Sequence, residues 1–260
     1  MKLITGLLLC FLFVFVGCND DDDDKMSSIE VRLTDSPAEY EKVLIDVEEV
    51  RINASSDDEG GWQTLSTEDG IYDLLEFTNG NDTLLAGEDL PVGQISQMRL
   101  ILGDDNSLVK EGSTYPLETP SAQQSGLKFN INAELVEGVN YKIWIDFDAG
   151  RSIVEKGNGT YSLKPVIRTF TEATSGSIKG IINPVNVRSY IAAISAANDT
   201  IGTFNDTISG EFLLRGIEAG NYEVEIEPGS DYEEQEFEGV SVILGEVTDL
   251  GTITLMMQPQ

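Results

Sequence analysis

Residues Gly210–Val224, with the sequence GEFLLRGIEAGNYEV, carry the clearest strand pattern of the chain. Side chains alternate between the two faces of an extended chain. Phe212 and Leu214 therefore share one face of a strand, and Tyr222 and Val224 share one face of the next. The glycines of the stretch supply tight turns, because glycine adopts backbone angles that other residues avoid. The pattern predicts short strands joined by tight turns, and thus a β-fold.

The same pattern extends outward from the linker Ala173–Gly176 to Leu255. The spacing G-x-F-x-L…G-x-Y resembles the carboxypeptidase regulatory-like (transthyretin-like, or prealbumin-like) domains, as do the closing segments Gly239–Val242 and Leu250–Ile253. The resemblance implies a seven-stranded β-sandwich over residues 176–257. It does not imply peptidase activity, because a zinc carboxypeptidase needs histidine ligands and this chain has no histidine.

Before the linker, strand-like runs alternate with turn residues from Ile29 to Phe170, which is typical of a second sandwich. A short helical stretch is expected around Tyr72–Phe77. Pro165 predicts an edge position or a break within the last run, since proline cannot donate to a strand ladder. The predicted strands lie around Ile29–Leu33, Val43–Val47, Gln97–Leu102, Leu127–Leu135, Tyr141–Phe147 and Tyr161–Phe170.

Short motifs in this first part occur in a fixed order. They are Leu33–Pro37 (LTDSP), Trp62, Tyr72–Leu75 (YDLL), Leu90–Gly93 (LPVG), Met98–Leu100 (MRL), Thr119–Ser121 (TPS), Ser125–Lys128 (SGLK), Asp146–Ala149 (DFDA) and Leu163–Arg168 (LKPVIR). Together they resemble the family known as domain of unknown function 4382, over residues 29–171. The resemblance implies an extracytoplasmic β-domain that often occurs on lipoproteins, and it assigns no activity and no catalytic residue.

The N-terminus predicts where the protein resides. Lys2 precedes an apolar run from Leu3 to Val16, too short for a membrane span and typical of a secretory signal. The following Gly17-Cys18 resembles the lipobox of bacterial lipoproteins, which implies a signal peptide over residues 1–17 and lipid attachment at the Cys18 thiol. The alternative is an ordinary cleaved signal peptide that ends in cysteine.

Five aspartates, Asp20–Asp24, follow the lipobox and form a like-charge block that stays solvated. We expect residues 18–28 to be an acidic tether. Its position resembles the export signal of lipoproteins at the outer leaflet of the outer membrane. The predicted location is therefore the outer membrane, with a lipid anchor and the folded part facing the cell exterior.

Composition excludes several classes of function. The chain has 260 residues, with 46 acidic against 16 basic ones and a formal net charge of −30, so nucleic acid is not an expected partner. The absence of histidine removes the usual general base and every histidine-dependent triad. Cys10 lies in the predicted signal peptide and Cys18 takes the lipid, which leaves no disulfide. We predict that the protein is not an enzyme and has no catalytic residues.

One metal site is a candidate. Asp146 and Asp148 alternate on a predicted strand, so their carboxylates share a face, and Asp35 lies in the turn motif LTDSP. Calcium prefers several hard oxygen ligands. The alternative is that Asp35 forms a turn before Pro37 and that the other two carboxylates cap hydrogen bonds or face water. No cofactor is expected beyond this calcium ion.

Three threonines are candidate O-glycosylation sites, because each lies in an Asp-Thr-apolar tripeptide: Thr83, Thr200 and Thr207. The alternative for each is an Asp-Thr turn that leads into a strand. Four aromatic residues are candidates for a sugar-stacking platform, although such residues more often belong to cores: Trp62, Tyr115, Trp144 and Tyr190.

The sequence favours a non-enzymatic, lipid-anchored surface protein that acts by binding or adhesion. The first alternative is a carbohydrate-binding component of a surface glycan-uptake system, and the second is a structural spacer or assembly factor. The expected partners are the membrane, through the lipid anchor, and a glycan or another surface protein.

Overall fold

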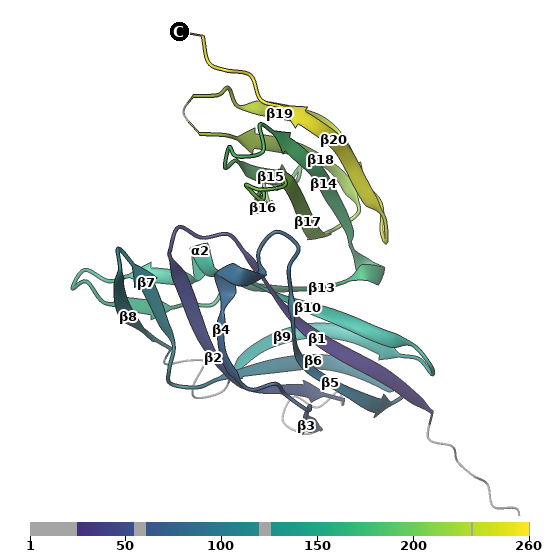
Figure 1. Cartoon of the computed structure of the whole chain (residues 1–260). Coiled ribbons are helices and arrows are strands. Elements are labelled where there is room, and N and C mark those ends of the chain that lie inside the picture. The colour runs from purple at the N-terminus through teal and green to yellow at the C-terminus, as the bar shows by residue number, and fades with distance from the viewer. Residues whose placement is uncertain (1–24, 55–60, 120–125, 230, 260) are drawn as a thin grey trace, which may run out of the picture.

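A computed structural model describes residues 25–54, 61–119, 126–229 and 231–259 (Figure 1). Strands dominate these residues, so the predicted all-β class is confirmed. Within the same ranges, no helix has the length and apolar character needed to cross a membrane. We call residues 25–171 the N-terminal half and residues 176–259 the C-terminal half.

The described part of the N-terminal half forms two sheets. One has the strand order β13-β10-β1-β5, with β1 and β10 parallel. The other has the order β11-β12-β8-β7-β2-β6-β9, and β3 and β4 also pair with β2. The strands are β1 (Met26–Ser36), β2 (Lys42–Asn53), β3 (Trp62–Thr64), β4 (Gly70–Asp73), β5 (Thr83–Pro91), β6 (Gly93–Leu102), β7 (Ser107–Lys110), β8 (Ser113–Glu118), β9 (Leu127–Leu135), β10 (Asn140–Asp148), β11 (Ile153–Glu155), β12 (Tyr161–Leu163) and β13 (Ile167–Thr171).

The C-terminal half has seven strands among the residues that the structure describes. They form a sheet of order β17-β14-β20 and a sheet of order β16-β15-β18-β19. The number agrees with the predicted sandwich, and membership in the transthyretin-like family stays a prediction. The strands are β14 (Gly176–Asn183), β15 (Tyr190–Ile194), β16 (Thr200–Phe204), β17 (Glu211–Ile217), β18 (Gly220–Glu227), β19 (Gln235–Val242) and β20 (Val247–Thr254).

Short helical turns join some strands: η1 (Leu74–Phe77), α2 (Ala149–Ser152) and η2 (Glu172–Thr174). The helical turn expected at Tyr72–Phe77 is therefore present, and Asp73 caps it by accepting a hydrogen bond from the Leu75 amide. The chain leaves the strand conformation around Pro165, between β12 and β13, as the sequence predicted. The predicted domain boundaries, 29–171 and 176–257, stay predictions.

Each half has its own hydrophobic core. In the N-terminal half, alternate residues of β1 and β10, such as Val31, Leu33, Ile145 and Phe147, point between the two sheets. In the C-terminal half the core includes Phe212 and further residues of the stretch with the clearest strand pattern. Burial of this apolar surface is the main favourable term in folding.

The opposite face of the sheet β13-β10-β1-β5 points out of the N-terminal core, and only part of it is covered: Asn140 and Lys142 at the start of β10 are exposed, whereas the following residues of this face are not. Trp144 and Asp146 alternate with the core residues of β10, but they are only 4% and 3% exposed. They are buried because the C-terminal half lies over this face (Figure 1). We call this contact between the halves the junction.

We expect Phe147→Ala to lower the free energy of unfolding by about 3–5 kcal/mol, because the side chain is fully buried and its removal leaves a cavity. Urea denaturation measures the change. The matched control is Val136→Ala, at a residue that is 50% exposed, where a change within about 0.5 kcal/mol is expected. Equal effects of the two substitutions would contradict the assigned core.

Candidate functional site

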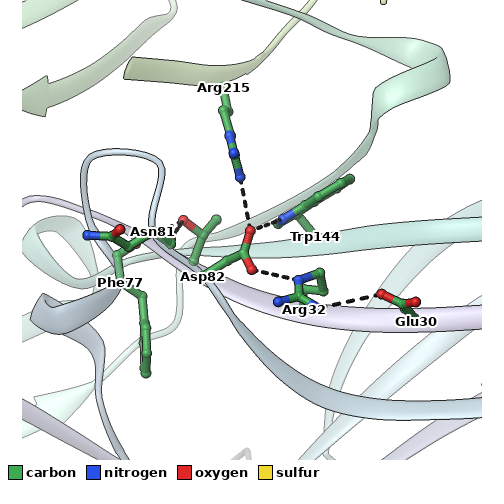
Figure 2. A network of polar contacts seen from close by, with 8 residues as sticks. Glu30, Arg32, Phe77, Asn81, Asp82, Trp144 and Arg215 are labelled. Atoms are coloured by element: carbon green, nitrogen blue, oxygen red, sulfur yellow. Dashed lines mark hydrogen bonds and ion pairs between the residues drawn. The ribbon is translucent and has the colours of Figure 1, made fainter. Parts of the chain in front are cut away.

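The Asp82 carboxylate lies at the centre of the junction. It lies directly before β5 and accepts three hydrogen bonds from three different strands (Figure 2). Arg32 Nε of β1 donates to Oδ1 at 2.6 Å, and Trp144 Nε1 of β10 donates to Oδ2 at 2.8 Å. Arg215 Nη1 comes from β17 of the C-terminal half and donates to Oδ2 at 2.9 Å. One carboxylate therefore joins both halves.

The charge of Asp82 is stabilised in this position. Burial by itself would raise its pKa, but the hydrogen bonds from Trp144 and Arg32 and the charges of Arg32 and Arg215 outweigh burial and lower the pKa. Only 13% of the Asp82 side chain is exposed, so these charge-assisted hydrogen bonds are weakly screened. Asp82 is therefore ionised at neutral pH.

Arg168 makes the second polar contact across the junction. Its Nε and Nη2 both lie 2.5 Å from Asp146 Oδ2, on the neighbouring strand. The same guanidinium donates from Nη1 to the Gly216 carbonyl at 2.6 Å and from Nη2 to the Arg215 carbonyl at 2.9 Å. Arg168 thus binds two carbonyls near the C-terminal end of β17, while the buried Asp146 carboxylate neutralises its charge.

Asn79 makes the third contact, with the edge of β17. Its Oδ1 accepts a hydrogen bond from the Leu213 amide at 2.8 Å, and its Nδ2 donates to the Glu211 carbonyl at 3.1 Å. The side-chain amide therefore pairs with β17 as a neighbouring strand would, and so covers part of an open sheet edge. Gly80 follows with a φ of 78°, and a Cβ there would lie 2.6 Å from Leu213 Cδ2.

Aromatic stacking completes the junction. Trp144 and Phe170 stack with 5.5 Å between ring centroids and 6° between ring planes. Phe170 in turn lies against Gly216, where a Cβ would come within 2.4 Å of the ring. The absence of a side chain at Gly216 is what allows the two halves to approach this closely.

The structure brings the three candidate calcium ligands to one end of β1 and β10, but not to one face. Asp35 lies on the core face of β1, in line with Val31 and Leu33, whereas Asp146 and Asp148 lie on the junction face of β10. Each carboxylate also has a protein partner, since Asp35 Oδ1 accepts from the Ala149 amide and Asp148 Oδ1 from the Arg151 amide. Asp146 binds Arg168, as described above.

No group of three or more acidic or cysteine side chains with metal-binding geometry occurs within the described ranges. The calcium site therefore stays a prediction without geometric support. Asp148 instead caps α2, which agrees with the alternative derived from the sequence. Burial, aided by the charges of Asp146 and Asp148, raises the pKa of Asp35 well above its usual range.

The other candidate residues lie apart from one another. Thr83 is half-buried in β5, beside Asp82, whereas Thr200 and Thr207 are exposed. Their glycosylation stays a prediction, and Cys18 lies outside the described residues. The candidate aromatics form no common platform: Arg99 lies 4.0 Å from the Trp62 ring centroid, Tyr115 packs against Tyr161, Trp144 is buried in the junction, and Tyr190 packs against Phe204.

Sequence reasoning missed the roles of Asp82, Arg168, Arg215 and Asn79. In the sequence, Asp82 belongs to the Asp-Thr-apolar tripeptide of Thr83, and the two arginines belong to motifs that imply no contact between the halves. Since all four belong to contacts between residues more than 20 positions apart, no local pattern marks them.

Residues 26–165 match the family described as "Domain of unknown function (DUF4382)". The match covers more than half of the chain, which therefore belongs to this family. No curated protein matches the chain.

Among solved structures, the chain is similar to GBS52, the minor pilin of Streptococcus agalactiae, with 10% identity over 89% of this chain and 97% of the other, and a TM-score of 0.27. It is also similar to a fimbrial protein from Bacteroides ovatus, with 9% identity over 90% of this chain and 51% of the other, and a TM-score of 0.25.

A type II cohesin-X-dockerin complex from Acetivibrio cellulolyticus matches 32% of this chain at 21% identity, with a TM-score of 0.27. The chain spans 58% of the length of that matched chain. At these TM-scores, none of the three likenesses carries an argument about function.

We expect Asp82→Ala to lower the free energy of unfolding by about 1–3 kcal/mol, because it leaves the partly buried donors of Arg32, Trp144 and Arg215 without their acceptor. Urea denaturation measures the change. The matched control is Asp249→Ala, which removes an exposed ion pair with Lys179 and a hydrogen bond from the Gly251 amide, and which should cost clearly less than Asp82→Ala. A loss at Asp82 no larger than at Asp249 would contradict its central role.

We also expect the stability of Asp35→Asn, relative to the native protein, to rise as the pH rises from 4 to 7. Asp35 has a raised pKa when folded, so the native chain loses stability as the pH rises above the pKa of the unfolded chain, and asparagine does not titrate. Denaturation at several pH values measures this slope. Asp249→Asn should show the opposite sign, and its change should lie at pH values near and below the pKa of the unfolded chain, because folding lowers the pKa of Asp249. A flat difference for Asp35→Asn would disprove this assignment.

Proposed function

We propose that this chain is a lipid-anchored protein of the outer cell surface that acts by binding or adhesion and catalyses no reaction. The observation that carries the proposal is the use of the junction residues. The junction contains carboxylates, arginines and an indole, which are side chains of the kind that active sites use. Here they bind one another and join the two halves. Their arrangement supports a protein whose two halves are held in a fixed orientation and whose surface binds a partner, and it does not support catalysis.

The location is part of the proposal. The lipobox-like Gly17-Cys18 and the block Asp20–Asp24 support a lipid anchor at Cys18 and export to the outer leaflet. Lipid chains on one residue hold a protein to a membrane without a spanning helix. The aspartates Asp20–Asp24 then separate β1, which starts at Met26, from the membrane surface.

A structural spacer is the second candidate function, and the junction favours it as well. Asp82, Arg168 and Asn79 fix the two halves by side-chain contacts instead of leaving them on a free linker. A binding protein and a spacer differ in ligand retention. We expect the purified full chain, in detergent, to be retained on an array of immobilised extracellular glycans and proteins. No retention on any member of the array would leave only the spacer.

We expect Cys18→Ser to move the protein from the membrane fraction to the soluble fraction, because serine cannot take the thioether-linked lipid. Immunoblots of fractionated cells measure this change. Replacing Asp20–Asp24 by asparagines should keep the protein in the membrane fraction but protect it from protease added to whole cells. Cys10→Ser is the matched control and should change neither result. A Cys18→Ser protein that stays in the membrane would contradict the lipid anchor.

A further inference from the structure

A groove with a volume of about 750 Å³ lies between the two halves, beside the junction but separate from its polar contacts. One wall comes from the loop after β1, the end of β7 and α2, and includes Tyr40 and Lys110. The other wall comes from β15, β16 and β18, and includes Arg188, Tyr190 and Phe204. Figure 1 shows α2 of the N-terminal half close to β15 and β16. We call this hollow the aromatic groove.

The strand register aligns part of one wall. Tyr190 of β15 pairs with Phe204 of β16 on one side and with Glu227 of β18 on the other. The neighbouring residues Ile191 and Ile226 belong to the core of the C-terminal half, so the row Phe204-Tyr190-Glu227 lies on the outward face. Two aromatic rings and a carboxylate thus stand side by side in the groove.

These rings are held in place before any ligand arrives. Tyr190 and Phe204 meet edge to face, with 5.3 Å between centroids and 61° between planes. The Arg188 guanidinium lies 3.4 Å from the Phe204 ring centroid. A Cβ at Gly202 would lie 1.9 Å from the Tyr190 hydroxyl oxygen, so Gly202 makes room for the tyrosine ring. Such pre-organisation reduces the entropy that binding must overcome.

The opposite wall adds a third ring and a cation. Tyr40 is half-buried and packs against the N-terminal core, which fixes its position. Lys110 lies in the same wall, where its Nζ is 3.4 Å from Glu155 Oε2 and 3.5 Å from the Tyr161 hydroxyl. The groove therefore offers aromatic faces on both walls, with charged donors and acceptors between them.

We propose that the aromatic groove binds a neutral oligosaccharide, an inference that rests on the proposed surface-binding function. A sugar presents C–H groups to aromatic faces and hydroxyls that both donate and accept hydrogen bonds. The groove provides rings for the former, and Arg188, Lys110 and Glu227 for the latter. Glu39, Glu227 and Glu234 outnumber the two cations of the groove and oppose an anionic glycan. The polar lining opposes an apolar peptide or a lipid.

The test uses the purified full chain in detergent, with isothermal titration calorimetry and affinity electrophoresis. The probes are maltohexaose, cellohexaose, xylohexaose and mannohexaose, and hexagalacturonate is the anionic comparison. We expect at least one neutral hexasaccharide to bind. Tyr190→Ala should weaken that binding at least tenfold, and Gly202→Ala should weaken it less strongly, because it only displaces the tyrosine ring.

Tyr141→Ala is the matched control. Tyr141 is a half-buried tyrosine at the start of β10, whereas the groove lies at the opposite end, beside α2, so this substitution should leave the affinity unchanged. Urea denaturation verifies that each variant is folded, and Gly202→Ala keeps the test valid if Tyr190→Ala does not fold. Binding of none of the neutral probes, binding of hexagalacturonate alone, or unchanged affinity in folded groove variants would each overturn the inference. Retention on immobilised proteins without any glycan binding would support the proposed function and would overturn only the inference that the aromatic groove binds an oligosaccharide.

Discussion

The structure depends on one ionised carboxylate, Asp82, that is shared between two sandwiches. A buried charge is costly unless it is paired and hydrogen-bonded. Arg32 and Trp144 of the N-terminal half supply two of the three hydrogen bonds to Asp82, and Arg215 of the other half supplies the third. Docking of the C-terminal half removes water from this carboxylate, and Arg215 supplies a hydrogen bond in its place. This constraint gives the junction a defined geometry, which general hydrophobic contact alone would not specify.

The fold could be predicted in large part from the sequence, because it follows from local patterns. Alternation placed Trp144, Asp146 and Asp148 on one face of a strand, and glycine spacing predicted the turns of the C-terminal half. Alternation cannot show which other part of the protein covers a given face of a strand. Trp144 appeared suitable for stacking a sugar, yet it is buried against Phe170 because the second half lies over it. The rings that line the groove, Tyr40 on one wall and Tyr190 and Phe204 on the other, face a common space only through the arrangement of the two halves.

Asp35 gives a second example of what could not be predicted from the sequence. The turn motif LTDSP suggested a ligand beside Asp146, whereas β1 continues to Ser36 and turns the Asp35 side chain toward the core. One residue of register decides between the two faces of a strand. The local sequence could not show that the strand continues this far, because Thr34–Ser36 are held in it by parallel pairing with β10, more than 100 residues later.

The position of β1 also determines how the protein carries mechanical load. In the lipid-anchored form that we propose, a pull on the far end of the protein acts along β1, the first described strand. β1 is an inner strand, paired with β10 from Ser28 to Ser36 and with β5 from Met26 to Leu33. Tension along its axis acts on both ladders in shear, so many hydrogen bonds must break together, whereas an edge hairpin would open one bond at a time. The same placement that buries β1 in its sheet thus places the first described strand of the chain between two ladders that resist the pull together.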